Sequence, residues 1–294
     1  MRWNLAVAAL SASFGLVSVI VRGVDLDAAV LVFYRCAIAV PAIGLALAVT
    51  RRAFVLRRPR TFRLALLLGT TLGVHWFFFF ETIKLSSVAF AVLAAYLAPI
   101  LVGLLAPVVL PERRSRVALV ALIPAAAGLA LVVSGGGDGV EVRPLALLTG
   151  LGAALTYAAL VIGTKAVSAR VSAAGLTFWN YVFAGLVMVP FLLGAERVAP
   201  EPGELPYIAL LGLFFTTVTG YLYIWLIRKV TAQTMGVIAY LEVVSAALLA
   251  WAIFGEELTW QIVVGGSLII LAGLAVVLFE PEDAAALEES RIVA

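Results

Sequence analysis

Long apolar runs alternate with short charged or Gly/Pro-rich interruptions along the whole chain. The hydrocarbon core of a bilayer, about 30 Å thick, is crossed by about 20 residues of α-helix. Cutting the sequence at its interruptions gives segments of about this length. We therefore predict an all-α integral membrane protein with ten transmembrane helices, at residues 4–21, 28–49, 64–83, 88–110, 117–133, 145–166, 173–194, 207–227, 231–254 and 262–279.

The chain contains one pattern twice. An Ala-Tyr-Leu triplet at residues 95–97 returns at 239–241, an offset of 144 residues, and a Gly-Leu-Ala helix segment at 128–133 returns at 273–278. Because five helices is an odd number, the second copy must cross the membrane upside down relative to the first. Inverted repeats of this kind characterise secondary transporters, whose sites lie near the midplane where the halves meet. We predict two inverted five-helix repeats at residues 1–136 and 145–280, followed by a tail at 281–294.

Lys and Arg residues are unevenly distributed among the connections between these helices. Cytoplasmic segments carry the excess because positive flanks are held back during insertion. With the amino terminus inside, fifteen cations fall in inside segments. Arg35 lies within a span, and the outside segments hold only Arg22, Lys84, Arg143 and Arg197. The distribution predicts that both termini are cytoplasmic.

Composition supports this architecture and excludes several functions. Hydrophobic residues make up 64% of the chain and charged ones 13%, against roughly 45–50% and 25% in soluble domains. The single cysteine, Cys36, permits no internal disulfide. The single histidine, His75, excludes a multi-histidine metal site, and no Gly-x-x-x-x-Gly-Lys-Ser/Thr motif occurs for an ATP-driven pump. We expect no cofactor, no metal and no nucleic-acid partner.

Few ionisable side chains fall inside predicted helices, where their cost makes them pointers to function. Arg35 lies in the second span, His75 in the third and Glu242 in the ninth. His75 is either a neutral hydrogen-bonding group between helices or part of a cavity wall. Glu242 is either a coupling group or a structural one, with Arg35 as one partner, although Arg35 could instead pair with Glu81. Glu242 lies about 200° around its helix from Tyr240, so the two cannot both point into one cavity.

Aromatic and hydroxyl side chains cluster in the spans that the repeat relates to one another. Thr216, Thr219, Gly220 and Tyr223 share one helical face, and the offset aligns Thr219 with His75. Such walls hold apolar groups by burial and ammonium groups by cation–π attraction. We predict a central cavity whose substrate-binding residues are His75, Trp76, Phe79, Tyr96, Tyr157, Trp179, Thr219, Tyr223 and Tyr240, with Glu242 and Arg35 as coupling or structural charges.

Two local signals concern helix geometry. Pro99 lies mid-span beside Tyr96 and can bend the fourth helix, but its counterpart is Val243, so the two halves should not bend alike. Gly69 and Gly73 form a Gly-x-x-x-Gly face that favours close helix contact.

The two copies of the repeat resemble the EamA branch of the drug/metabolite transporter superfamily. Tyr-Leu-Ala-Pro at 96–99 runs to Leu-Pro-Glu-Arg at 110–113, and Leu-Glu-Val-Val at 241–244 runs to Phe-Gly-Glu-Glu-Leu at 254–258. The family pattern usually has proline after the position of Glu242, where this chain has Val243. The resemblance covers nearly the whole chain, and the aromatic interior looks most like that of YddG-type amino-acid exporters.

The resemblance implies a multi-pass protein of the bacterial inner membrane that exports amino acids or related metabolites by alternating access. We expect the substrate and the lipid bilayer to be its only partners, and expect it to act as a monomer. Export of xenobiotic cations is an alternative, and both facilitated diffusion and proton exchange stay open. A phosphorylated-sugar carrier would need more cavity cations than Arg35. An intramembrane enzyme, with His75 serving a serine, ranks last.

Overall fold

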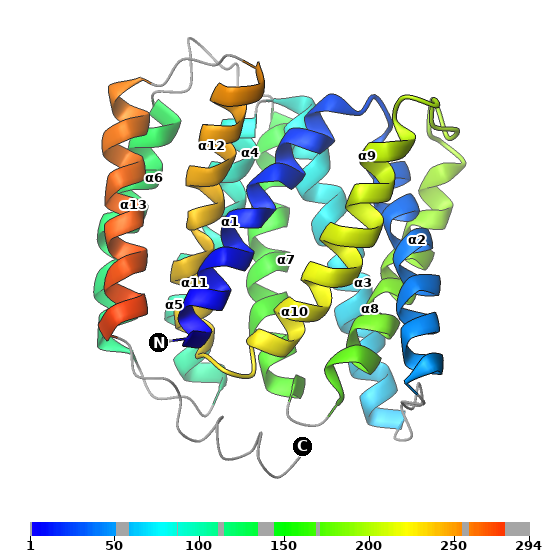
Figure 1. Cartoon of the computed structure of the whole chain (residues 1–294), viewed down its shortest axis with the longest axis horizontal. Coiled ribbons are helices and arrows are strands. Elements are labelled where there is room, and N and C mark those ends of the chain that lie inside the picture. Colours follow the sequence, from blue (N-terminus) through cyan, green and yellow to red (C-terminus); the bar gives the residue numbers. More distant parts are fainter. Residues whose placement is uncertain are drawn as a thin grey trace.

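The computed structural model describes residues 2–50, 59–86, 88–110, 115–134, 144–168, 171–254 and 259–279, and its regular structure there is helical. The helices pack side by side in one bundle (Figure 1). The first half contains α1 (Arg2–Gly23), α2 (Ala28–Val49), α3 (Pro59–Leu85), α4 (Val88–Ala95), α5 (Ala98–Val109) and α6 (Arg116–Ser134). The second contains α7 (Pro144–Ser168), α8 (Ala173–Leu192), α9 (Leu205–Leu210), the π-helix η1 (Leu211–Val218), α10 (Thr219–Leu226), α11 (Ala232–Ala239), α12 (Leu241–Phe254) and α13 (Trp260–Phe279).

The predicted fold class is confirmed. Within the described ranges, seven helical stretches are long and apolar enough to cross a bilayer, and three shorter apolar helices, at Ala98–Val109, Arg116–Leu131 and Val263–Val276, complete ten crossings. Helix α2 has the predicted bounds, whereas α3 begins at Pro59 rather than at residue 64. The predicted turns at Glu112 and Glu256 and the tail at 281–294 lie outside the described residues.

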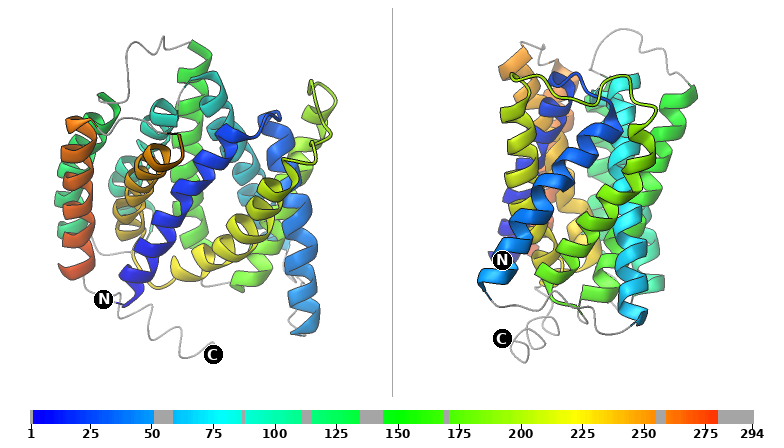
Figure 2. Two further views of the ribbon diagram at one scale, coloured as in Figure 1. Left: turned by 45° about the horizontal axis from the view of Figure 1, so that its top comes forward. Right: turned by 90° about the vertical axis from the view of Figure 1, so that its right-hand side faces the viewer.

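Helix packing follows the repeat. Three spans of the first half contact their own counterparts: α2 contacts α8, the fourth span contacts the ninth through α5 and α11, and α6 contacts α13. Helix α3 packs against α7 and α8, and its counterpart, formed by η1 and α10, packs against α1 and α2. Figures 1 and 2 both show α6 and α13 together at one edge of the bundle. This exchange of partners is the pattern expected when two halves are related by a pseudo-two-fold axis in the membrane plane.

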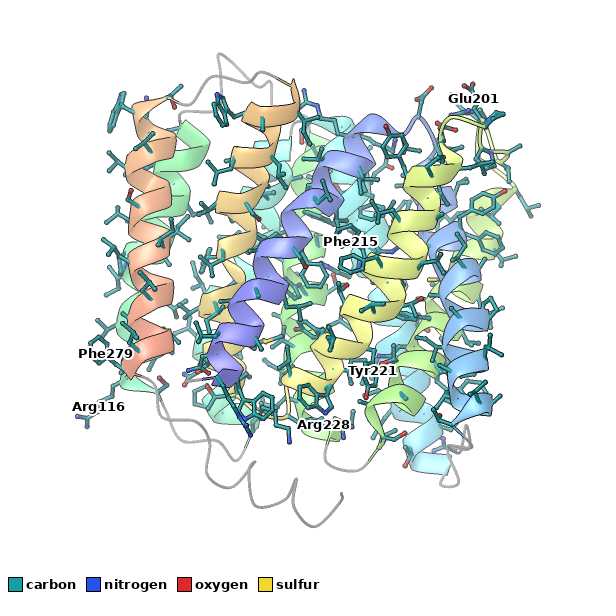
Figure 3. All side chains as sticks on the ribbon, viewed as in Figure 1. Arg116, Glu201, Phe215, Tyr221, Arg228 and Phe279 are labelled. Atoms are coloured by element: carbon teal, nitrogen blue, oxygen red, sulfur yellow. The ribbon has the colours of Figure 1, made fainter. Side chains whose placement is uncertain are left out.

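The two ends of the bundle carry different groups. Figure 3 places Arg116, Arg228 and Phe279 at the end where α1 begins, and Glu201 at the opposite end. Helix α13 therefore finishes at the end where α1 starts, as an even number of crossings requires. The positive-inside rule assigns the end with Arg116 and Arg228 to the cytoplasm.

Small residues set how closely some of these helices approach. A Cβ atom added at Gly69 would lie 2.7 Å from Cβ of Phe183, and one at Gly73 would lie 2.7 Å from the carbonyl oxygen of Ala184. Both neighbours belong to α8, so the predicted Gly-x-x-x-Gly contact is confirmed and joins α3 to α8. Without side chains at 69 and 73, the two backbones can touch.

The fourth and ninth spans are each interrupted at an equivalent tyrosine. Helix α4 stops one residue before Tyr96, and α11 stops one residue before Tyr240. At both places the backbone tightens, with the Leu97 amide donating to the Ala94 carbonyl at 3.3 Å and the Tyr240 amide donating to the Val237 carbonyl at 3.2 Å. Bonds that span three residues are typical of tight turns at helix ends.

The absence of a second proline predicts that the two halves do not bend alike, yet both spans are interrupted at the equivalent tyrosine. Pro99 occupies the first turn of α5, where its missing N–H costs nothing, but no proline accompanies the second interruption. There the Tyr240 hydroxyl donates a hydrogen bond to the Tyr96 carbonyl at 3.0 Å. The second interruption is thus accompanied by a contact between the halves instead of a proline.

Candidate functional site

A cavity of about 150 Å³ lies inside the bundle and is lined by residues of both halves. Its walls come from α1, α2, α3, α4, α7, α8, η1, α10 and α12, together with Tyr96 at the interruption of span four. Phe215, which lies at mid-height in Figure 3, forms part of the wall. Eight predicted site residues line it, namely Arg35, His75, Trp76, Phe79, Tyr96, Tyr157, Tyr223 and Glu242.

Arg35 is held at the cavity by α2 and is almost completely buried. Its Nε donates to the Thr216 hydroxyl at 2.8 Å, and that hydroxyl donates in turn to the Leu211 carbonyl at 2.6 Å. The guanidinium carbon lies 3.8 Å from the centre of the Trp76 ring. The predicted pairing with Glu81 or Glu242 does not occur, because neither carboxylate forms an ion pair with Arg35 within the described residues. Aromatic contact orients the cation without neutralising it.

Glu242 lies on a different part of the wall. It occupies the first turn of α12, directly after the interruption at Tyr240, where the helix amino terminus favours a negative charge. Its carboxyl group is within electrostatic reach of the hydroxyls of Tyr96, Tyr157 and Tyr223. The hydroxyls of Tyr96 and Tyr223 are buried beside Glu242 and Tyr157, respectively, but within the described residues neither forms a hydrogen bond of normal length and angle. Buried hydroxyls are rarely left unsatisfied, so this group of oxygens is suited to a donor from a ligand.

His75 combines the two roles that the sequence left open. Its Nδ1 lies 3.0 Å from the Ala153 carbonyl oxygen, and its ring stacks on Tyr157 with 5.2 Å between ring centres. Because a carbonyl can only accept, Nδ1 must carry the proton, which leaves Nε2 of the neutral ring as an acceptor. His75 thus joins α3 to α7 and also lines the cavity.

Three predicted site residues do not line this cavity. Trp179 packs against Phe183 with 5.7 Å between ring centres, in a separate aromatic group. The Thr219 hydroxyl donates to the Phe215 carbonyl of its own span at 2.7 Å. Tyr240 lies behind Tyr96, with 5.5 Å between the ring centres. As the helical geometry predicted, Glu242 and Tyr240 do not both face the cavity.

A π-helix interrupts the predicted face of span eight. The predicted face assumed 3.6 residues per turn, but in η1 the hydroxyls of Thr216 and Thr217 reach carbonyls five residues earlier. Of the predicted face, Gly220 and Tyr223 line the cavity, whereas Thr216 and Thr219 do not.

Sequence reasoning missed Tyr181 as a site residue. Its hydroxyl donates to the Thr216 carbonyl at 2.6 Å, and its ring stacks on Trp76 with 5.8 Å between ring centres. Gly220 makes room for it, since a Cβ there would lie 1.6 Å from the Tyr181 oxygen. The neighbouring Asn180 also lines the cavity, and its Oδ1 is buried without a partner. An intramembrane asparagine was the signal that could have drawn attention to this part of α8.

The remaining lining residues that the sequence did not single out are mostly apolar, and include Phe14, Val17, Phe80, Leu160, Phe215 and Ile224. Together they give the cavity an apolar body. The polar groups are confined to a few positions, as in sites that bind small molecules with a fixed orientation.

The repeat is also visible in comparisons with known proteins. A model of the EamA-like transporter family matches residues 1–134 and matches again over residues 144–279. The chain belongs to the EamA-like transporter family. An uncharacterized transporter of Archaeoglobus fulgidus is 30% identical over 285 residues, which span 94% of this chain and 96% of the relative. A crystal structure of another protein has a TM-score of 0.77 at 20% identity, covering 94% of this chain and 96% of that one, and so shares the fold.

Membership in the EamA-like transporter family makes the chain a multi-pass secondary transporter of small molecules rather than an enzyme. The two matched copies meet at the cavity just described. A transporter of this type must let its halves separate alternately at the two ends.

Hydrogen bonds join the two halves of this EamA-like transporter at both ends. At the end of the bundle where α1 begins, the Gln233 side chain donates to the Gly103 carbonyl at 3.0 Å and accepts from the Ser115 amide at 2.7 Å. At the opposite end, Glu204 accepts from the Asp25 amide at 3.0 Å and from Arg197 at 2.7 Å. Burial acts to raise the pKa of Glu204, but these bonds outweigh it and hold the pKa below its usual value.

Proposed function

We propose that this transporter exports amino acids or related small zwitterions across the bacterial inner membrane by alternating access. The proposal rests on one observation, that Arg35 and Glu242 line the same cavity without forming an ion pair within the described residues. Isolated charges are costly inside a membrane protein. A substrate that carries both charges would offset both costs.

The remaining walls favour a substrate with an apolar part. Phe14, Phe79 and Phe215 contribute aromatic surface to the cavity, which holds apolar side chains by removing them from water. An aromatic interior with a few polar side chains supports the proposal that this transporter functions like YddG-type amino-acid exporters. A carrier of phosphorylated sugars is less well supported, because Arg35 is the one Lys or Arg among the described lining residues.

Export of organic cations is the second candidate. Glu242 and the three tyrosines near it would suit a cation by charge and by cation–π attraction. This candidate leaves Arg35 unexplained, since a cationic substrate would be repelled by the guanidinium that shares its cavity.

The test is a counterflow screen of the twenty amino acids in proteoliposomes, with a lipophilic cation and a hexose phosphate as competing substrate classes. We expect exchange of one or more amino acids and none of the hexose phosphate. Repeating uptake with and without a pH gradient separates proton exchange from facilitated diffusion. Liposomes without protein provide the background, and exchange of the lipophilic cation alone would replace the proposal with the second candidate.

A further inference from the structure

We infer that the cavity binds an α-amino acid in one orientation, with its carboxylate at Arg35 and its ammonium group at Glu242. The inference rests on the proposed function and adds to it two separate subsites. The carboxylate subsite consists of Arg35 and the side chains that orient it. The ammonium subsite consists of Glu242, Tyr96 and Tyr223.

The carboxylate subsite has an unused part of a guanidinium. Arg35 is 2% exposed and uses its Nε for Thr216, and within the described residues its two terminal nitrogens form no hydrogen bond. Trp76 and Phe80 hold the guanidinium from the sides, at 3.8 Å and 5.5 Å from its carbon. A guanidinium fixed in this way presents its terminal N–H groups as a fork that matches a carboxylate.

The ammonium subsite has acceptors that lack donors. The Tyr96 side chain is 2% exposed, yet its hydroxyl has no partner, and the same is true of the buried Tyr223 hydroxyl. Both lie near the Glu242 carboxyl group, and all three residues line the cavity. An ammonium group has three donors and no acceptor. It would therefore satisfy the carboxylate and both hydroxyl oxygens together, and the aromatic faces would stabilise it further.

The two subsites are separate because their contacts do not overlap. Arg35 contacts Thr216, Trp76 and Phe80, whereas Glu242 lies near Tyr96, Tyr157 and Tyr223. The two charges form no ion pair with one another. An amino acid carries both charges and would engage both subsites, while a simple amine or a simple acid would engage only one.

The test compares an amino acid with two analogues that each lack one charge. The probes are the amino acid exchanged best in the counterflow screen, its decarboxylated amine and its deaminated acid; for leucine these are 3-methylbutylamine and 4-methylpentanoate. Binding to the full-length protein in nanodiscs is measured by competition. For the wild type, we expect the amino acid to bind at least about tenfold more tightly than either analogue, since one charge-assisted hydrogen bond contributes about that factor.

Variants of the two subsites should then show opposite selectivity. Glu242→Gln should weaken binding of the amino acid and of the amine about tenfold and leave binding of the acid unchanged. Arg35→Gln should weaken binding of the amino acid and of the acid and leave binding of the amine unchanged. Arg35→Lys should lose less affinity than Arg35→Gln. Glu81→Gln, which removes a carboxyl of α3 that does not line the cavity, is the matched control and should bind like the wild type.

Two further variants protect the test against misfolding. Tyr96→Phe and Tyr223→Phe remove hydroxyls that form no hydrogen bond of normal geometry within the described residues, so they should fold normally and still weaken binding of the amine selectively. If each subsite variant lost affinity equally for the amine and the acid, the proposed orientation would be overturned, but the proposed function of amino-acid transport would stand. If the wild type exchanges none of the twenty amino acids, the proposed function itself fails.

Discussion

Tyr96 and Tyr240 occupy equivalent positions in the two repeats, and each interrupts its span, yet the two side chains do different things. Tyr240 is fully buried, and its hydroxyl donates to the Tyr96 carbonyl. Tyr96 lines the cavity, and within the described residues its hydroxyl forms no hydrogen bond of normal geometry. One tyrosine joins the two halves, and the other faces the cavity.

The difference shows how a duplicated fold can acquire a site with one orientation. The repeat supplies paired helices and paired interruptions, which are similar in both halves. The charges and hydrogen bonds are not repeated, because Glu242 corresponds to Ala98 and Gly220 corresponds to Trp76 at the offset of 144 residues. A symmetric cavity could not distinguish the two ends of a zwitterion, whereas a cavity with Arg35 and Glu242 on different parts of its wall has the asymmetry that the proposed orientation requires.

The largest expected effect concerns the pair of Gly220 and Trp76, which together accommodate Tyr181. Gly220→Ala would place a methyl group 1.6 Å from the Tyr181 oxygen and disrupt its bond to the Thr216 carbonyl. We expect destabilisation of about 2 kcal/mol, typical of an overpacked core, measured by thermal unfolding of the purified protein. Gly23→Ala, where an added Cβ meets nothing within 4 Å, is the control. Equal unfolding temperatures for the two variants would contradict this account of position 220.

The tyrosine pair itself gives the next effect. Tyr240→Phe removes the bond to the Tyr96 carbonyl and leaves that buried acceptor unsatisfied, so we expect a loss of about 1 kcal/mol. Tyr96→Phe removes an unpaired hydroxyl and should not lower the unfolding temperature. The two proteins are compared in one detergent by the same thermal measurement. The comparison drawn above fails if Tyr96→Phe is the less stable of the two.

A smaller contrast separates His75 from Thr219, which the repeat also makes equivalent. His75 bonds to Ala153 of another helix, whereas Thr219 bonds to Phe215 of its own span. His75→Leu should cost about 1 kcal/mol through the lost bond between helices, while Thr219→Val should stay within about 0.5 kcal/mol of the wild type. Thermal unfolding again provides the measurement. A Thr219→Val protein destabilised as much as His75→Leu would show that the local bond matters more than the structure indicates.

Most of the fold could be predicted from the sequence because hydropathy and the repeat act on whole helices. Apolar runs located ten crossings, and the offset between the Ala-Tyr-Leu triplets located the duplication. The second interruption could not be predicted, since no proline marks it. It is accompanied by the bond from the Tyr240 hydroxyl to the Tyr96 carbonyl, which is a contact between distant parts of the chain.

The candidate site was predictable where a single residue carried the signal. Arg35, His75 and Glu242 were identified because ionisable groups are rare inside membranes, and all three line the cavity. Thr219 was misplaced because helical spacing alone does not show that its hydroxyl bonds to the Phe215 carbonyl of its own span, and the sequence also gives no sign of the π-helix η1. Which of these residues bind substrate stays a prediction.

The smallest expected effect concerns the connections at the two ends of α8. The connection that follows α8 contains the charged Glu204 carboxylate, which accepts hydrogen bonds from the amides of Asp25 and Glu201 at 3.0 and 2.8 Å. The beginning of α8 is instead capped by the neutral hydroxyl of Ser172, which accepts from the Gly175 amide at 3.1 Å. Since the pKa of Glu204 is lowered, its stabilisation is present above the ordinary carboxyl pKa of about 4.3 and is lost as the pH falls through the lowered value. We expect hydrogen-exchange protection of the Asp25 and Glu201 amides to fall a few-fold on acidification, while Gly175 keeps its protection. Glu204→Gln should abolish this pH dependence. A variant that retained it would show that another titratable group controls the protection of these amides.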